Sequence, residues 1–238
     1  MYHSITIGDK NTWDDWKLIP LSRPVVNPPD VYTKYVEIPG YDGSVDLTEL
    51  LTGRPTYARR TGDWQFIVTH DYDGYDWQTV YSSIMNHLHG EEMEVRLEDD
   101  PDYFYTGRLS VSDWKSGNSY STITISYELM PFKLNNISSA DDWIWDDFNF
   151  EDEHSVIRDY GGLRVDGSLT IRIIGGEKTV VPEIAVSAPM SITYNGFTEI
   201  YESPGVYHAV DLAIIPGEND MVITGDGVVS VIFRGASL

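Results

Sequence analysis

The chain has 238 residues, of which 41% are hydrophobic and 13% aromatic, so it holds enough apolar material for one large domain or two small ones and is not a disordered chain. It carries 38 acids against 16 bases, and a protein with a net charge of -22 is repelled by the phosphates of nucleic acid and by anionic membranes, so we expect neither as a specific partner. It has no cysteine, which excludes disulfides, thiolate nucleophiles and zinc–thiolate sites.

The first half of the chain is predicted to consist mostly of strands. Its opening, MYHSITIGDK, lacks a basic segment followed by an apolar run, and no later stretch approaches the length of a membrane span, so we expect synthesis in the cytoplasm. Residues 22–32 contain three prolines and are expected to form an extended connecting arm, with a PxxP-type ligand as the alternative. Apolar and polar residues alternate, as in half-buried strands, over residues 3–8, 64–70, 103–114 and 121–129.

One helix is predicted, over residues 77–89. Asp76 is placed to cap its start and Gly90 to end it. His87 and His89 lie near its end, but side chains two residues apart do not share a helix face, so they do not form a metal site. The apolar residues at helical spacing are Trp77, Val80, Tyr81, Ile84 and Leu88.

The composition changes after residue 134. Residues 141–153 hold seven acids interleaved with Trp143, Trp145, Phe148 and Phe150, and we interpret residues 137–158 as a connection whose aromatic side chains dock on a neighbouring surface. From residue 159 onward, short apolar segments are separated by Gly, Pro and Asn-Gly turns, which is typical of a β-sandwich. The segments expected to be strands are 167–174, 178–187, 190–195, 206–215, 221–225 and 228–235.

No catalytic motif is found. The stretch DGSVDLTELLTGRPTYARRTGDWQF, residues 42–66, contains glycines and arginines but no G-x-x-x-x-G-K-[ST] phosphate loop and no G-x-S-x-G nucleophile turn. The segment from Asp71 to Asp76 lacks the glycine and the acid that a calcium loop requires. We therefore predict no catalytic residues, no cofactor and no metal, and a protein that is not an enzyme.

The order of several segments resembles the amino-terminal part of phage distal tail proteins, the ring-forming hubs between tail tube and baseplate of phages and prophages of Gram-positive bacteria. The segments are SITIGDKNTWDDWKLIP, VEIPGYDGSVDLTELLTGRPTYARRTGDWQF, YSSIMNHLHG, RLEDDPDYFYTGRLSVSDW and ITISYELMPF, which together span residues 2–134. The carboxy-terminal half is similar to the second domain of the same proteins, through VPEIAVSAPMSITYNG and IIPGENDMVITGDGVVSVIFRGASL.

The resemblance implies a mainly β protein of two β-sandwich domains. The first, residues 1–136, is the ring-forming domain with one α-helix, and the second, residues 159–238, is galectin-like or similar to a carbohydrate-binding module. It further implies a homo-hexamer located in the virion tail. The implied partners are the tail tube protein, tail-tip proteins of the tail-associated lysozyme or fibre type, and receptor-binding proteins.

Two sets of residues are candidate contacts. Arg54, Arg59 and Arg60 are bases in an acidic protein, and their guanidinium groups suit carboxylates of an adjacent subunit or, equally, those of their own subunit.

The alternative function is a carbohydrate-binding adhesion module that contacts the host cell wall. Its candidate stacking residues are Tyr194, Phe197, Tyr201 and Tyr207, for which a place in the core or in a turn is the competing interpretation.

Overall fold

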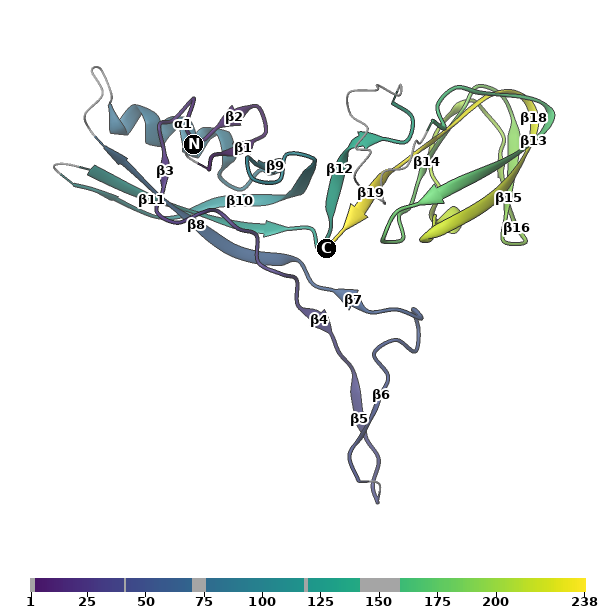
Figure 1. The fold of residues 1–238 in the computed structure, drawn as a ribbon, viewed down its shortest axis with the longest axis horizontal. Helices are drawn as coiled ribbons and strands as arrows, with labels where there is room; N and C mark the ends of the chain where they lie inside the picture. Colours follow the sequence, from purple (N-terminus) through teal and green to yellow (C-terminus); the bar gives the residue numbers. More distant parts are fainter. Residues whose placement is uncertain (1–2, 41, 70–75, 118–119, 142–158) are drawn as a thin grey trace. The chain divides into compact units, whose positions relative to one another are not determined.

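The computed structural model describes residues 3–40, 42–69, 76–117, 120–141 and 159–238. The chain divides into two compact units: unit 1 comprises Met1–Lys133 with Leu238, and unit 2 comprises Leu134–Ser237. Both units are built mainly from strands, as predicted, with one α-helix among the described residues (Figure 1). Most of the acidic and aromatic connection predicted over residues 137–158 lies outside the described residues.

The main sheet of unit 1 is antiparallel throughout and runs in the order β2-β1-β9-β10-β11-β8-β3. Its longest ladder joins β11 to β8, from the pair Leu129 and Arg60 to the pair Tyr120 and Thr69. The strands are β1 (Ile5–Ile7), β2 (Lys10–Asn11), β3 (Ile19–Pro20), β8 (Arg60–Thr69), β9 (Glu92–Leu97), β10 (Tyr103–Ser116) and β11 (Tyr120–Leu129).

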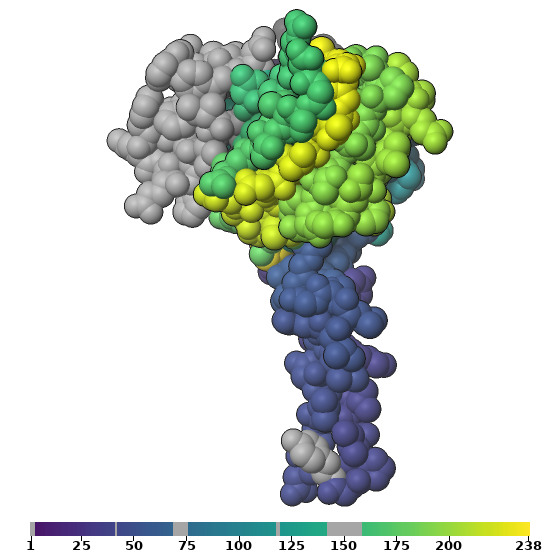
Figure 2. Space-filling model, turned by 90° about the vertical axis from the view of Figure 1, so that its right-hand side faces the viewer, coloured from purple at the N-terminus to yellow at the C-terminus, as the bar shows by residue number. Residues whose placement is uncertain are grey.

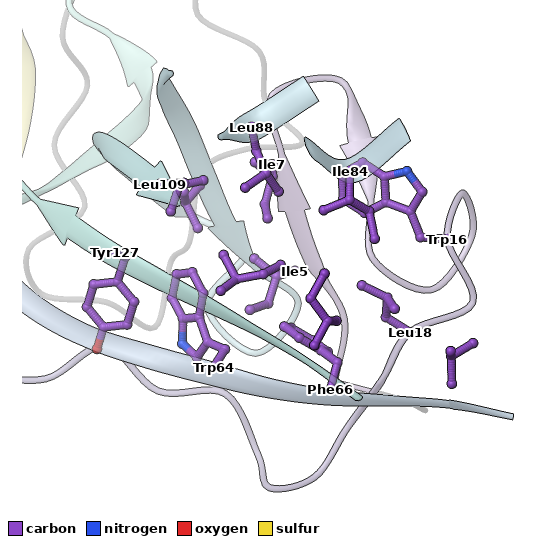
Figure 3. Packing of buried hydrophobic residues seen from close by; sticks show 14 of the residues in the cluster. Ile5, Ile7, Trp16, Leu18, Trp64, Phe66, Ile84, Leu88, Leu109 and Tyr127 are labelled. Atoms are coloured by element: carbon purple, nitrogen blue, oxygen red, sulfur yellow. The ribbon is translucent and has the colours of Figure 1, made fainter. Parts of the chain in front are cut away.

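Helix α1 (Trp77–Leu88) closes the core over one face of this sheet. The carboxylate of Asp76 accepts hydrogen bonds from the backbone N–H groups of Gln78 and Thr79, which caps the helix as predicted. Ile84 and Leu88 are fully buried and point towards Ile7 and the sheet (Figure 3).

The two histidines of the helix end are held by the backbone. The Nε2 atom of His87 lies 2.9 Å from the carbonyl of Ile7, and the Nδ1 atom of His89 accepts a hydrogen bond from the N–H of Val111 at 3.1 Å. The two rings have different partners, so they do not converge on one ligand. Among the described residues, no group of three or more His, Asp or Glu side chains is placed to hold a metal ion.

The proline-containing segment predicted as an extended arm follows the outer edge of β8. The N–H of Leu21 donates to the carbonyl of Gln65 at 2.9 Å, and the indole N–H of Trp64 donates to the carbonyl of Val25 at 2.8 Å. The side-chain amide of Asn27 donates to the carbonyl of Thr61 at 2.9 Å. Because proline lacks an N–H, a segment of this composition covers the edge of a sheet without extending it.

Unit 2 is built around a long antiparallel hairpin of β13 and β18, which pair from Leu163 and Val229 to Gly175 and Gly217. On its other side β18 pairs with β15 at one end and with β14 at the other, and the sheet order is β16-β15-β18-β14-β17. The strands are β13 (Leu163–Gly175), β14 (Glu183–Val186), β15 (Met190–Tyr194), β16 (Phe197–Tyr201), β17 (Gly205–His208) and β18 (Gly217–Ile232).

One long strand replaces the two that the sequence predicted around residues 221–235. Gly225 was expected to end the first of these strands and Gly227 to lie in the turn after it, but both lie inside β18 with φ of +145° and +155°, a conformation that favours glycine. A Cβ at Gly225 would lie 2.9 Å from the carbonyl oxygen of Pro189. The glycines therefore let β18 continue past the segment that connects β14 to β15 along its edge. A second difference is that residues 206–215 are not one strand: β17 ends at His208, and a short 3-10 helix (Val210–Leu212) follows.

The start of unit 2 is attached to the end of β18. The hydroxyl of Ser139 donates to the carbonyl of Val231 and accepts from the N–H of Phe233, both at 2.8 Å. Ser139 is only 1% exposed. Strand β12 (Lys133–Ser138) pairs with β19 (Arg234–Ser237) beside this contact. Residues 134–139 are thus part of the fold of unit 2.

Candidate interaction arm

Residues 28–59, called the arm from here on, leave the main sheet of unit 1 as a narrow two-stranded ribbon (Figures 1 and 2). Nearest the sheet β4 pairs with β7, and further out β5 pairs with β6. Gly40 and Gly43 both have positive φ in the turn between β5 and β6. The bounds of the four strands are β4 (Val31–Tyr32), β5 (Tyr35–Glu37), β6 (Ser44–Asp46) and β7 (Thr56–Tyr57).

The described residues of the arm expose seven large apolar side chains. A soluble monomer rarely shows so many on one extended segment, and an isolated two-stranded ribbon has too little core to be stable by itself. Leu51 is 96% exposed and Leu50 is 72% exposed, in the bend between β6 and β7. Among the described residues of the arm, the set is Val31, Tyr32, Tyr35, Val36, Ile38, Leu50 and Leu51. These side chains make the arm a candidate interaction surface.

The root of the arm, in contrast, is buried and fixed. Arg60 is 4% exposed, and its guanidinium donates to the carbonyl of Asn27 at 2.9 Å and to that of Pro131 at 2.8 Å. The N–H of Asn27 donates to the hydroxyl of Tyr127 at 3.0 Å. Arg60 also lies over the ring of Tyr105, 5.5 Å from its centre. The strands that enter and leave the arm are therefore tied to one another and to the core.

Burial affects the titration of this root. It lowers the pKa of the Arg60 guanidinium, and it raises the pKa of the Tyr105 and Tyr127 hydroxyls. Arginine remains charged at neutral pH despite such a shift, so the root holds a cation that main-chain carbonyls solvate. Arg60 therefore has a structural role, because its hydrogen-bonded guanidinium nitrogens donate to carbonyls of its own chain.

The three arginines predicted as intersubunit contacts occupy different settings. Arg54 is exposed in the arm, and its side chain has no ion pair among the described residues. Arg59 is 44% exposed and lies 3.5 Å from the carboxylate of Glu128 in the same unit. Arg60 is buried at the root. Of the three, Arg54 is the one that is available to a neighbouring chain.

The four aromatic residues predicted as candidates for carbohydrate stacking also differ in their exposure. Tyr194 and Tyr201 are 5% and 2% exposed within the core of unit 2, so their rings present no face to a ligand. Tyr207 packs against Tyr201 with ring centres 4.9 Å apart, and its hydroxyl donates to the carbonyl of Ser203. Phe197 is 47% exposed on β16.

The exposed apolar side chains of the arm were not predicted from the sequence. In the stretch IPGYDGSVDLTELLTGRPTYARR, the glycines and arginines indicate turns and ion pairs, but they give no indication of which apolar residues are exposed. The sequence does contain a signal for their exposure. Leu50 and Leu51 lie between glycines and threonines, in a stretch that lacks the alternation of apolar and polar residues by which a strand buries one face.

No protein-family model matches the chain, and the comparison with curated proteins finds no match. The comparison with solved structures finds the crystal structure of the Dit protein (gp 19.1) of phage SPP1. It covers 100% of both chains with a TM-score of 0.60 at 12% sequence identity.

The chain has the fold of SPP1 Dit. At this low identity the likeness concerns the fold, and it confirms the resemblance of the sequence to phage distal tail proteins at that level. SPP1 Dit is described as a paradigm of the hub adsorption apparatus in phages that infect Gram-positive bacteria. Within the described part of the chain, no helix is long and apolar enough to cross a bilayer.

Proposed function

We propose that the chain is a structural, non-enzymatic subunit of the tail tip of a phage, prophage or tailocin. In this proposal six copies close into a ring hub that joins the tail tube to the baseplate or receptor-binding apparatus. The observation that carries it is the arm: a ribbon with seven exposed apolar side chains, on a fold like that of SPP1 Dit. The partners are the tail tube protein, tail-tip proteins and receptor-binding proteins.

The arm is suited to building a ring in this proposal. A segment that projects from one place and docks at another place on an identical chain can repeat head to tail, and such contacts close into rings when the rotation permits; the same arm exchanged reciprocally would give a two-fold dimer, which the mass measurement below distinguishes. Burial of the exposed apolar side chains of the arm supplies the driving force, at about 25 cal/mol for each Å² removed from water. In this proposal Arg54, which is exposed on the arm, pairs with a carboxylate of the neighbour.

The charge of the chain suits a hub through which DNA passes. Each copy carries a net charge of -22, so a ring of copies repels phosphates and lets DNA slide without being held. Duplex DNA is therefore expected not to bind the purified protein at physiological salt. A tight complex in an electrophoretic shift assay would contradict this part of the proposal.

Light scattering after size exclusion, combined with electron microscopy, tests the proposal. We expect a six-fold ring with a mass six times the 27.0 kDa of one chain. The double substitution Leu50→Lys with Leu51→Lys should reduce the species to a monomer, because it places two charges where apolar burial is needed. The control is Thr198→Lys on an exposed strand of unit 2, which should assemble normally. A monomer at all concentrations of the unsubstituted protein would refute the ring.

A carbohydrate-binding adhesion module is the second candidate, and the exposed ring of Phe197 is the observation that favours it. Aromatic side chains bind sugars by stacking on the apolar face of the ring. If this function is correct, the protein binds cell-wall glycan in a pull-down, and Phe197→Ala abolishes the binding. Failure to retain any glycan would leave the ring hub as the only candidate.

A further inference from the structure

The turn between β15 and β16 contains the only Asn-Gly pair of the sequence, Asn195 and Gly196. The two residues have φ of +50° and +79°, and the flanking residues Tyr194 and Phe197 pair with each other. These features identify a two-residue turn of type I′, for which Asn-Gly is the preferred sequence because both central residues need a positive φ. The fold thus places this pair where its main-chain geometry is fixed.

An asparagine that precedes glycine can lose ammonia without an enzyme. The backbone nitrogen of Gly196 attacks the side-chain Cγ of Asn195, the Cγ–Nδ2 bond breaks, and Nδ2 leaves as ammonia with the proton of the backbone N–H. Water then opens the resulting succinimide ring at one of its two carbonyl carbons, which gives aspartate or isoaspartate; in isoaspartate the main chain runs through the side-chain carbons. Glycine permits this attack most readily because it has no Cβ beside the nucleophilic nitrogen.

The geometry of the turn, and not access of water, limits this reaction in the folded protein. Both residues are exposed, and a Cβ on Gly196 would meet no described atom within 4 Å beyond its chain neighbours. Ring closure requires the Cβ of Asn195 and the nitrogen of Gly196 to lie nearly eclipsed about the Cα–C bond, because a five-membered ring is almost planar. At the ψ of about +30° that a type I′ turn has here, the nitrogen of Asn195 lies near that eclipsed position instead. The folded turn therefore keeps Cγ away from its nucleophile.

Contacts on both faces of the hairpin hold the turn in this conformation. The hydroxyls of Thr193 and Thr198, which form the cross-strand pair next to the turn, lie 2.8 Å apart. On the opposite face, the hydroxyl of Tyr194 donates to Oδ1 of Asn219, a side chain that is only 1% exposed. Rotation about ψ of Asn195 therefore requires this end of the hairpin to open.

We propose that Asn195 is a site of spontaneous deamidation, which the β15–β16 turn suppresses and which opening of this hairpin permits. The opening is local, because within the described part of the chain β16 pairs only with β15, and edge elements open at a lower free energy than the whole domain. The two products differ in their consequence. Aspartate also suits a type I′ turn, whereas isoaspartate lengthens the main chain and disrupts the two-residue register between β15 and β16.

The rate of deamidation in folded and unfolded protein tests the proposal. The full chain is incubated at neutral pH in buffer and, in parallel, in guanidinium chloride that unfolds it. Mass spectrometry of the peptide that contains residue 195 measures the replacement of the amide by a carboxyl group. We expect the unfolded chain to react at least tenfold faster. Equal rates would show that the turn gives no protection, and no reaction in either sample would show that Asn195 is not a deamidation site; either result overturns the proposal.

A matched pair of variants tests whether opening of the hairpin controls the rate in the folded protein. Thr198→Val removes the hydroxyl contact beside the turn and keeps a β-branched side chain, so deamidation should become at least threefold faster at an unchanged melting temperature. Thr224→Val makes the same change at an exposed position of β18 and should react like the unsubstituted protein. If Thr198→Val leaves the rate unchanged, or if both variants react faster to the same extent, the contacts of the turn do not control the reaction.

The two products provide the third readout. Asn195→Asp represents one of them and should melt at the temperature of the unsubstituted protein. Chains that carry isoaspartate, separated after incubation in denaturant and then refolded, should melt at a lower temperature. If the isoaspartate chains melt like Asn195→Asp, the turn does not confine the main chain at residue 195, and the proposed origin of the protection is wrong.

Discussion

The guanidinium of Arg60 and the carbonyl of Asn27 are joined by a 2.9 Å hydrogen bond across the root of the arm. The two residues lie on the strand that leaves the arm and on the segment that enters it, so the bond closes the arm's base. A second bond, from Arg60 to the carbonyl of Pro131 at 2.8 Å, attaches that base to the end of the sheet. The projecting segment is thus carried on a fixed base.

Removing this cation should destabilise unit 1. Arg60→Met leaves two carbonyls without a donor, and hydrogen bonds to charged groups contribute about 1.5–3 kcal/mol each. We expect a loss of about 3 kcal/mol in urea unfolding followed by tryptophan fluorescence, which reports mainly on unit 1 because five of the seven tryptophans lie there, and only Trp143 and Trp145 lie in unit 2. Arg54→Met, in the exposed arm, should change stability by less than about 0.5 kcal/mol. Similar losses for the two variants would show that Arg60 does not fix the root.

The packing of α1 can be tested at Leu88. Leu88→Ala should cost about 2–5 kcal/mol because the side chain is fully buried and its loss leaves a cavity. Ser82→Ala should be nearly neutral. Ser83→Ala is a poorer control, because the Ser83 hydroxyl accepts a hydrogen bond from the indole N–H of Trp16, with 3.3 Å between Nε1 and Oγ. Equal small effects at Leu88 and Ser82 would contradict the buried position of the helix.

Gly225→Ala should destabilise unit 2 by at least about 1–3 kcal/mol. The new Cβ requires an unfavourable positive φ and overlaps the carbonyl oxygen of Pro189, so the backbone must move. Thr224→Ala, the exposed neighbour in β18, should stay within about 0.5 kcal/mol. Calorimetry of the full chain measures both changes. A neutral Gly225→Ala would mean that the backbone at Gly225 is not confined by Pro189 as described.

Acid should loosen the contact between the amino-terminal segment and the turn after β9. The hydrogen bond from Arg23 and then the one with His3 lower the pKa of Asp99 below its usual value of 3.8. A carboxyl with a depressed folded-state pKa stabilises the fold fully above its unfolded pKa, and this stabilisation is lost as the pH falls through the folded pKa. Asp99→Asn should therefore lower the free energy of unfolding at pH 7, and the difference from the unsubstituted protein should shrink progressively below pH 3.8. If the loss in free energy of unfolding caused by Asp99→Asn does not become smaller in acid, the ionised carboxylate is not the source of the stabilisation.

Unit 2 should need its first residues, 134–139, for full stability. A fragment of residues 134–238 retains the hydrogen bonds of Ser139, whereas a fragment of residues 154–238 loses them and exposes the end of β18. We expect both to be monomeric in light scattering and the shorter one to melt at the lower temperature. The fragments 1–136 and 1–153 should still self-associate, because the arm lies in the first half. If the second half alone self-associates while the first half stays monomeric, the ring-forming domain is the second half and not the first.

The sequence predicted those features that depend on local patterns. Alternation located β10 and β11, and Asp76 identified the start of α1, because caps and strand periodicity are determined by neighbouring residues. Gly227 was wrongly expected to lie in a turn, since the reason for this glycine is the close approach of Met190, a partner that is distant in sequence. Arg54, Arg59 and Arg60 were indistinguishable in sequence, because only the three-dimensional contacts separate an exposed, a paired and a buried guanidinium.

The continuity of β18 has a mechanical consequence. This one strand pairs with β15 along its first part and with β14 along its last part, while β13 pairs along its other edge. A pulling force along the strand is resisted in shear by these ladders at once, and neither β14 nor β15 can separate from the sheet without breaking its ladder to the same strand. A domain built in this way transmits load as a single body, a property that the proposed place in a tail tip would use.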